Sequence, residues 1–290
     1  MDINWYPGHM AKTIREMKSY IQQVDIVVEI CDARLPQASR NPELARLVGG
    51  RPLLLVLNKA DLADPSVTDR WIQWFRQKKI IAMAMDSTAK GQVKRLQKQM
   101  LDMNREQTER ARARGRLIRP TRLLVAGIPN TGKSTLINSL CGKKMAKTAD
   151  QPGVTRKITW IRAGQQLEML DSPGILWPDL GSRRHQLLLA ASGAIRDQLI
   201  PTDQVAAEMI SLLLERYPSD MQTRYQLDAD VTSAADQTEA VQYARLEQAA
   251  RQRGCLLPGG AADLDRFAGL FLDDLRSGRI GRISFEQPLI

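Results

Sequence analysis

The chain has 290 residues, of which 43% are apolar and 26% are charged, a composition typical of folded globular proteins rather than disordered ones. No apolar run approaches the roughly 18 residues of a membrane-spanning helix, and the start lacks a basic and then apolar leader, so we expect a cytoplasmic protein with no membrane partner. A net charge of +10 favours a polyanionic partner, whereas three widely separated cysteines argue against a disulfide framework or a zinc site.

Apolar patterning divides the first 180 residues into alternating helices and strands. Residues 10–22 carry apolar side chains at helical spacing, and a long helix is expected over 92–114. Short apolar runs rich in branched residues predict buried parallel strands. These runs are 26–31, 53–57, 80–85, 123–126, a stretch near Ile158, and 167–170, with a helix at 133–140 after the fourth. The alternation predicts an α/β fold with a doubly wound sheet.

The remainder of the chain has a different pattern. Apolar positions within 187–195, 205–214 and 264–275 predict helices. We therefore expect two domains, a nucleotide-binding domain over 1–180 and a smaller all-α domain over 181–290.

A tetrapeptide after the second strand predicts guanine recognition. In Asn58-Lys59-Ala60-Asp61 the carboxylate of Asp61 can accept from the N1 and N2 hydrogens of guanine, a donor pair that adenine lacks. Read alone, the tetrapeptide could be a helix N-cap, but its position after a strand and a second loop after the next strand favour base binding. The predicted guanine-binding residues are Asn58, Lys59, Asp61, Ser87, Thr88 and Ala89.

Residues 127–134 read Gly-Ile-Pro-Asn-Thr-Gly-Lys-Ser, which fits the phosphate-loop pattern G-x-x-x-x-G-K-S between a strand and a helix. We expect Lys133 to reach the β and γ phosphates of GTP and Ser134 to coordinate Mg²⁺. The side-chain oxygen of Asn130 could bind K⁺, although many similar loops hold no such ion. The predicted phosphate-binding residues are Asn130, Thr131, Gly132, Lys133, Ser134, Thr135 and Gly174.

Asp171-Ser172-Pro173-Gly174 follows the strand at 167–170, where GTPases carry Asp-x-x-Gly. Asp171 is expected to hold the magnesium ion through water, the N–H of Gly174 to meet the γ-phosphate, and Thr155 to be the magnesium-binding switch threonine. Many GTPases place a water-orienting glutamine at the position of Ile175. Isoleucine cannot orient water, so another group must do so, or the intrinsic rate is low.

The motifs stand in an unusual order, because the guanine-reading tetrapeptide precedes the phosphate loop. Joining the end of the Asp-x-x-Gly segment to the helix at 10–22 restores the usual GTPase order, which predicts a circularly permuted P-loop GTPase. In that arrangement residues 5–10 lie near the γ-phosphate. His9 is therefore the candidate catalytic group, and the alternative is an ordinary histidine near a flexible terminus.

The positive charge lies in the nucleotide-binding part. From residue 185 onward there are 10 Arg, no Lys and 15 acidic residues, a net of −5, which leaves +15 on residues 1–184. The densest basic stretch, 105–122, has seven arginines and two glutamates. Contact with RNA is favoured over a merely solvated helix and linker. We expect no DNA partner and a monomeric protein.

Taken together, residues 5–10 (Trp-Tyr-Pro-Gly-His-Met), 32–36 (Asp-Ala-Arg-Leu-Pro) and the three nucleotide motifs resemble the circularly permuted ribosome-biogenesis GTPase A family, also called YlqF or RbgA. Similarity extends to 253–255, Gly259-Gly260 and 276–282, and so covers nearly the whole chain.

The resemblance implies a GTP hydrolase that binds a late precursor of the large ribosomal subunit in its GTP state, is stimulated by that particle, and leaves after hydrolysis to GDP and phosphate. It also implies a catalytic histidine at His9, a K⁺-dependent site with Asn130, and a helical C-terminal domain that touches ribosomal RNA. Because 181–290 is acidic, that contact is expected to be confined to Arg245, Arg251, Arg253 and the arginines at 276–282.

Two other functions stay open. The chain could be an RNA-binding scaffold in which GTP is a structural ligand, or a GTP switch acting on a protein effector. Ile175 favours the scaffold, whereas Lys133, Ser134, Thr155 and Asp171 oppose it. The basic charge of residues 1–184 opposes the effector switch.

Overall fold

A computed structural model describes residues 15–146, 158–177, 179–227 and 238–288. The chain divides into two compact units. The first contains the described residues up to Leu180 together with the segment that starts at Glu286, and the second is Gly181–Phe285. In the part of the chain that the structure describes, no helix is long and apolar enough to cross a membrane.

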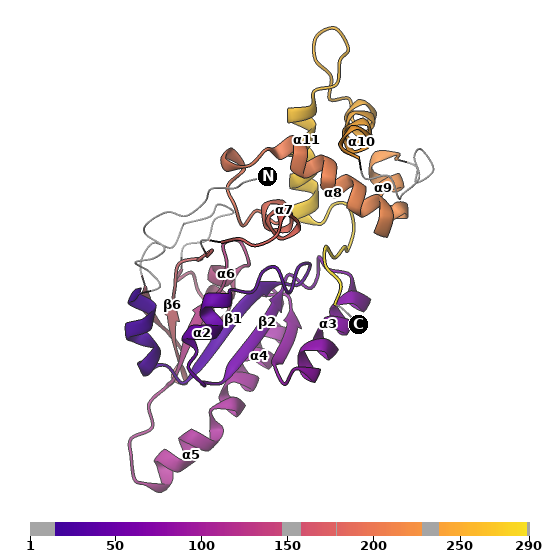
Figure 1. The fold of residues 1–290 in the computed structure, drawn as a ribbon. Helices are drawn as coiled ribbons and strands as arrows, with labels where there is room; N and C mark the ends of the chain where they lie inside the picture. Colours follow the sequence, from indigo (N-terminus) through magenta and orange to yellow (C-terminus); the bar gives the residue numbers. More distant parts are fainter. Residues whose placement is uncertain (1–14, 147–157, 178, 228–237, 289–290) are drawn as a thin grey trace. The chain divides into compact units, whose positions relative to one another are not determined.

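The first unit is built on a six-stranded sheet with the order β3-β2-β1-β4-β6-β5 (Figure 1). The strands are β1 (Ile26–Asp32), β2 (Leu53–Asn58), β3 (Ile81–Met85), β4 (Thr121–Ala126), β5 (Thr159–Ala163) and β6 (Leu167–Asp171). All neighbours pair in parallel except β5, which runs antiparallel to β6 at the edge. β1 is buried along its whole length, as expected for a parallel strand covered on both faces. The predicted α/β class is confirmed.

Helices cover both faces of this sheet. The helices of the first unit are α2 (Pro42–Leu47), α3 (Pro65–Gln77), α4 (Lys90–Met103), α5 (Arg105–Ala113) and α6 (Lys133–Cys141), preceded by a helical segment at 15–20 and the 3-10 turn η1 (Ile21–Gln23). On one face Leu96 of α4 and Leu136 of α6 pack against Val28 of β1. On the other face Phe75 of α3 packs against Cys31 of β1. The alternation of core residues along β1 therefore reflects two separate cores.

The strand order confirms the circular permutation. β4, which leads into the phosphate loop, is the fourth strand in sequence but lies in the middle of the sheet, between β1 and β6. The carboxyl ends of parallel strands meet at the same edge of a sheet, and each nucleotide motif follows such an end: β2 ends at Asn58, β3 ends two residues before Ser87, β4 ends before Gly127, and β6 ends at Asp171. Ligands of open α/β sheets bind at this edge, where the strand order reverses.

The single helix expected over 92–114 is wrong, because Asn104 separates α4 from α5 with φ −98° and ψ 2°. Asn104 is buried, and its side-chain Nδ2 donates to Thr121 Oγ1 at 3.0 Å, which fixes the break next to β4. Beyond it, α5 buries no residue and extends away from the sheet (Figure 1). Buried apolar residues recur along α4 only, so packing does not require the helix to continue through α5.

The second unit is helical over its described residues. It contains α7 (Arg183–Ala191), the 3-10 turn η2 (Asp197–Leu199), α8 (Thr202–Arg216), α9 (Pro218–Tyr225), α10 (Glu239–Gln252) and α11 (Leu264–Ser277). α8 packs against each of the other four α-helices. The rings of Tyr225, Phe267 and Phe271 cluster between α9 and α11. The predicted all-α C-terminal region is confirmed, although the polar helices α9 and α10 were not predicted.

Several arginines expected to touch RNA from this unit are engaged inside it. Arg245 is only 7% exposed, and its Nη1 donates to Ser211 Oγ at 3.0 Å, so its expected role as an RNA contact is wrong. Arg276 pairs with Asp197, and Arg279 pairs with Asp274. Arg253 is exposed. A basic residue count therefore overstates the free positive charge of this unit.

The tail returns to the first unit. The expected second domain ran to residue 290, but Glu286 lies with the first unit, where its carboxylate accepts from the N–H groups of Gln37 and Ala38 at 2.8 to 3.1 Å. Its own N–H donates to Arg34 O at 3.2 Å. Nothing in the sequence marks this contact, because a single glutamate near a terminus carries no pattern.

Candidate nucleotide site

The phosphate loop fits tightly against two neighbouring segments. Gly127 has φ 156°, and a Cβ on it would lie 2.3 Å from Ile30 O. Gly132 has φ 87°, and a Cβ there would lie 2.3 Å from Asn58 Nδ2. At both positions a side chain would clash with a neighbouring segment, and the positive φ angle also favours glycine. Asn130, between them, has a left-handed φ of 61°.

Two opposite charges are buried beside this loop without enough partners. Lys133 is 7% exposed and its Nζ donates to Ile128 O at 3.0 Å; burial lowers the pKa of this ammonium to about 8, opposed by Asp171. Burial raises the pKa of the Asp171 carboxyl to about 6, opposed by Lys133. Asp171 Oδ1 is buried and has no hydrogen-bond partner among the described residues. Each group favours a ligand that brings the opposite charge.

The base-reading motif is joined to the phosphate loop by Asn58. Its Nδ2 donates to Thr131 O at 2.8 Å, and its Oδ1 accepts from Ser87 N at 3.1 Å and from Ser87 Oγ at 2.5 Å. The buried amide of Asn58 thus links the phosphate loop, 73 residues away in sequence, to the loop after β3, 29 residues away. Thr88 and Asp61 are exposed and Ala89 is half-buried at this edge. The structure brings the predicted guanine-binding loops together.

Asp32 supports the base-reading lysine and was missed as a site residue. Its carboxylate accepts from Arg34 Nε at 3.0 Å and Arg34 Nη2 at 2.8 Å, and Lys59 Nζ lies 3.4 Å from Asp32 Oδ2. Burial would raise the pKa of Asp32, but the charges of Arg34 and Lys59 and the Arg34 hydrogen bonds hold it well below its usual value. The Asp-Ala-Arg motif at 32–34 was noted only as a family resemblance, and its spacing gave no hint of this ion pair.

The segment after β6 lies against the phosphate loop. A Cβ on Gly174 would lie 2.9 Å from the Cα and N of Pro129 and 3.0 Å from Lys133 Nζ, so only glycine fits without displacement. Ser172 Oγ donates to Val125 O at 2.9 Å. Ile175 is 4% exposed, and its N–H donates to Gly127 O at 3.3 Å. Asp-x-x-Gly thus lies where the sequence analysis expected it.

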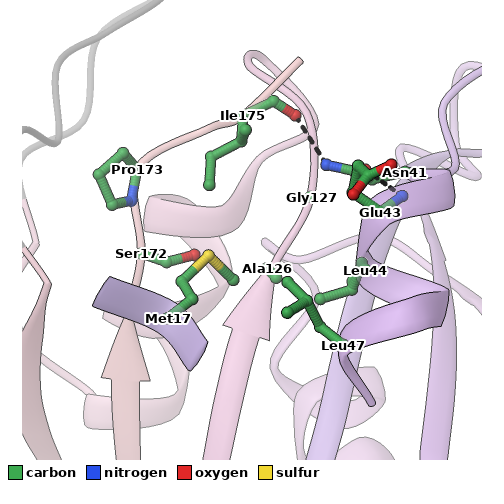
Figure 2. Close-up of a pocket in the computed structure, with 10 residues that line it drawn as sticks. All are labelled: Met17, Asn41, Glu43, Leu44, Leu47, Ala126, Gly127, Ser172, Pro173 and Ile175. Atoms are coloured by element: carbon green, nitrogen blue, oxygen red, sulfur yellow. Dashed lines mark hydrogen bonds between the residues drawn. The ribbon is translucent and has the colours of Figure 1, made fainter. Parts of the chain in front are cut away.

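A second residue that the sequence analysis missed is Asn41, in the loop before α2. Its Nδ2 donates to Ile175 O at 3.1 Å, across 134 residues of sequence (Figure 2). Figure 2 shows Ile175 above a small cavity also lined by Met17 and Leu44. The Asn41-Pro42 pair is a helix-start signal that could have located α2, but not the contact with Ile175.

The structure describes the positions of two of the four remaining predicted site residues. His9 and Thr155 lie outside the described residues. Ser134 and Thr135 are half-buried in the first turn of α6, next to Lys133. The ligand roles of all these residues stay predictions.

Comparison with known proteins identifies the class of this site. The family described as 50S ribosome-binding GTPase matches residues 122–248. The match starts in β4, just before the phosphate loop, and leaves the base-reading motif at 58–61 outside, as the permuted order requires. The chain is therefore a GTPase that binds guanine nucleotide.

Two solved structures share the fold over nearly the whole chain. The GDP-bound structure of TM YlqF has 26% identity and a TM-score of 0.64, covering 94% of this chain and 99% of that one. GNP-bound YlqF from T. maritima has 26% identity and a TM-score of 0.63, covering 96% and 98%.

Curated relatives are similar over their full length. Ribosome biogenesis GTPase A of Priestia megaterium is 39% identical over 99% of this chain and 98% of its own length. The protein of the same name from Thermotoga maritima is 30% identical over 99% and 95%. Mitochondrial ribosome-associated GTPase 1 of Mus musculus is 30% identical over 99% and 90%. On this similarity and on the shared fold, the chain belongs to the ribosome biogenesis GTPase A family.

Proposed function

We propose that this GTPase is a late assembly factor of the large ribosomal subunit, which binds the precursor particle and its ribosomal RNA while GTP is bound and leaves after hydrolysis. The names of its relatives and the 50S description of its matching family support this assignment. The observation that carries it is that one compact unit combines the nucleotide motifs with exposed arginines that have no ion-pair partner among the described residues.

Within the proposed site, each group has one task. Asp61 reads the N1 and N2 hydrogens of guanine, and Asn58, Lys59, Ser87, Thr88 and Ala89 complete the base pocket. The N–H groups of 130–135 and Lys133 hold the phosphates, and the Gly174 N–H meets the γ-phosphate. Hydrolysis then depends on charge stabilisation, because phosphoryl transfer relies mainly on positioning and electrostatics.

The residues present fit a magnesium ion. The buried, unpaired Oδ1 of Asp171 lies near the phosphate loop, and Ser134 stands beside Lys133 in the first turn of α6. Among the described residues no three His, Cys, Asp or Glu side chains gather as a protein-only metal site. Mg²⁺ usually takes one or two protein ligands plus substrate phosphates, which suits Ser134, Thr155 and Asp171. When bound, the ion neutralises charge that develops on the phosphate oxygens.

Two further groups complete the proposal. His9 replaces the missing glutamine, because the buried side chain of Ile175 offers no polar atom to orient water. Asn130 would contribute its side-chain oxygen to a K⁺ ion, which would supply further positive charge to the phosphates. Its left-handed conformation at the top of the loop places it where the phosphate loop turns.

The proposed RNA surface lies on α5 and the turn after it. Four of the seven arginines in this stretch have an acidic partner. Arg105 pairs with Glu109, Arg110 with Glu106, Arg119 with Asp25 and Arg122 with Glu168. The other three, Arg112, Arg114 and Arg116, are exposed and have no ion-pair partner among the described residues. Next to them Leu117 is 98% exposed. Exposed arginines without ion-pair partners, at the end of α5 and in the turn after it, favour phosphate contacts.

GTP turnover with and without purified large subunits tests the proposed function. We expect marked stimulation by large subunits in potassium, weaker turnover in sodium, and loss of the stimulated rate with intact GTP binding in His9→Ala. A turnover that large subunits leave unchanged would contradict the assembly role. Stimulated turnover unchanged in His9→Ala would eliminate the catalytic histidine alone.

The RNA surface has a matched control in the same basic stretch, on α5 itself. R112Q/R114Q/R116Q removes three unpaired charges, whereas R105Q/R110Q removes two paired ones. Each lost phosphate contact reduces the slope of log affinity against log salt by about 0.9 for a duplex. We expect the triple variant to lose close to three such contacts on a labelled RNA duplex and the control almost none. Equal losses would show only a bulk charge effect.

A further inference from the structure

The residue after Gly174 is held at both of its backbone polar groups. The Ile175 N–H donates to Gly127 O of the phosphate loop at 3.3 Å, and its carbonyl accepts from Asn41 Nδ2 at 3.1 Å. Two successive peptide groups directly after Gly174 are therefore held, one by the phosphate loop and one by Asn41 in the loop between β1 and α2, the second of which Figure 2 shows.

Asn41 is buried and is itself held in place by hydrogen bonds. It is 7% exposed, and its N–H donates to Glu29 Oε1 at 2.8 Å. Its side-chain Oδ1 caps α2 by accepting from Glu43 N at 3.0 Å, and Pro42 follows at the first helical position. Glu29 is completely buried on β1, and its Oε2 accepts from Arg40 Nε at 3.2 Å. The backbone of Asn41 is thus tied to β1 through Glu29, and its side-chain oxygen is tied to the first turn of α2.

The choice of asparagine is informative because capping alone does not need it. Ser, Thr, Asp and Asn are all favourable N-cap residues and stabilise a helix by similar amounts. Ionised Asp has no donor, and Ser and Thr carry donor and acceptor on one short hydroxyl, whereas Asn can cap the helix with its oxygen and donate to a more distant carbonyl from a separate nitrogen. The amide nitrogen of Asn41 donates to the Ile175 carbonyl, which lies outside α2.

We propose that Asn41 is a positioning residue for recognition of the γ-phosphate: by holding the Ile175 carbonyl, it keeps the segment after Gly174 in the arrangement that presents the Gly174 N–H to GTP. This inference rests on the proposed role of Gly174. GDP lacks the γ-phosphate and does not require that arrangement, so the Asn41 contact favours GTP over GDP. A contact made more strongly in one liganded state shifts affinity toward that ligand.

Nucleotide preference in the full-length protein tests the inference. In Asn41→Asp the cap is kept and the donor becomes an acceptor that faces the Ile175 carbonyl; in Asn41→Ser the cap is kept and the amide is lost. We expect the ratio of the GDP to the GMPPNP dissociation constants to fall by about 2- to 10-fold, the worth of one buried hydrogen bond. The GDP constant should stay near that of the wild type, and the melting temperature of the nucleotide-free protein should fall modestly, because a buried hydrogen bond is lost.

Glu43→Gln is the matched control, because it alters the same helical turn without touching Ile175. We expect it to keep the wild-type ratio. An unchanged ratio in both Asn41 variants, or an equal loss of GDP and GMPPNP affinity, would reduce Asn41 to a helix cap and overturn the inference. Wild-type protein that binds GMPPNP no better in the presence of Mg²⁺ than in its absence would instead contradict the proposed phosphate site itself.

Discussion

The base side and the phosphate side of the nucleotide site are built in different ways. On the base side, Asn58 satisfies its amide with Thr131 and Ser87, and Asp32 pairs with both Arg34 and Lys59. On the phosphate side, Asp171 has a buried oxygen with no hydrogen-bond partner in the described ranges, and the pKa of Lys133 is lowered. The polar groups of the base side have their partners without a ligand, whereas the buried charges of the phosphate side need partners that a ligand would supply.

This difference assigns separate tasks to the two sides. A closed hydrogen-bond network can hold the base-reading loop in one arrangement, so that a wrong base leaves the carboxylate of Asp61 without its donors. An incomplete charge pair binds strongly to a ligand that carries both anionic phosphate and a cation. Changes on the base side should therefore alter which nucleotide binds or how stable the free protein is. Changes on the phosphate side should alter the response to ligand or pH.

The largest expected effect is a change of nucleotide in Asp61→Asn. The asparagine amide would donate where guanine also donates, but it matches xanthine, which carries an oxygen at that position. We expect the relative affinity for GTP and XTP to shift by on the order of 10⁴-fold, as for sites built around a substrate hydrogen bond. Competition binding with both nucleotides measures this ratio.

The neighbouring carboxylate provides the control for that change. Asp86 accepts from the Thr88 N–H and hydroxyl at 2.7 Å and so holds the loop rather than the base. Asp86→Asn should retain the preference for GTP. If Asp61→Asn also retains it, Asp61 does not read guanine and the base side of the comparison is misassigned.

A medium effect is expected for stability against pH in the nucleotide-free protein. Folding raises the pKa of Asp171 from 3.8 to about 6, because burial disfavours its charged form. The folded state therefore holds this proton more tightly, and the resulting stabilisation is present below pH 3.8 and lost as pH rises through 6. The loss is on the order of 3 kcal/mol, at 1.36 kcal/mol for each pKa unit.

Denaturation of wild type and Asp171→Asn across pH 4 to 7 isolates this group, since the other carboxyls titrate in both proteins. We expect the variant to gain stability relative to wild type as pH rises. Asp69→Asn, an exposed carboxyl on α3, should follow the wild-type curve. Parallel curves for wild type and Asp171→Asn would mean that Asp171 is already paired in solution.

Much of the fold and of the site could be predicted because the motifs carry local physical requirements. The glycines of the phosphate loop are needed at close backbone contacts, and the apolar runs behind Asn58 and Asp171 are buried strands in a parallel sheet. Motif order alone therefore predicted the circular permutation, and the central position of β4 came from the structure.

The missed features depend on contacts between distant residues that have no local signal. Asn41 reads as a helix cap, and only the fold shows that its amide reaches Ile175. Asp32 and Glu286 are likewise single acidic residues whose partners are set by tertiary structure. The unpaired arginines on α5 could be counted but not separated from the paired ones, because pairing depends on side-chain geometry.

The smallest expected effect compares one serine from each side. Ser87 is 3% exposed and its hydroxyl donates to Asn58 Oδ1, so Ser87→Ala should lower the free energy of unfolding of the nucleotide-free protein by about 1 kcal/mol. Ser134 is half-buried beside Lys133, and its proposed partner is a ligand-borne cation, so Ser134→Ala should leave the free protein unchanged. Adding GTP with Mg²⁺ should reverse the order: the nucleotide raises the melting temperature of Ser87→Ala as it does in wild type, but raises that of Ser134→Ala much less. Equal responses of the two variants would show that the two sides are not built differently, because a preformed base pocket and a ligand-completed phosphate pocket cannot give the same pattern.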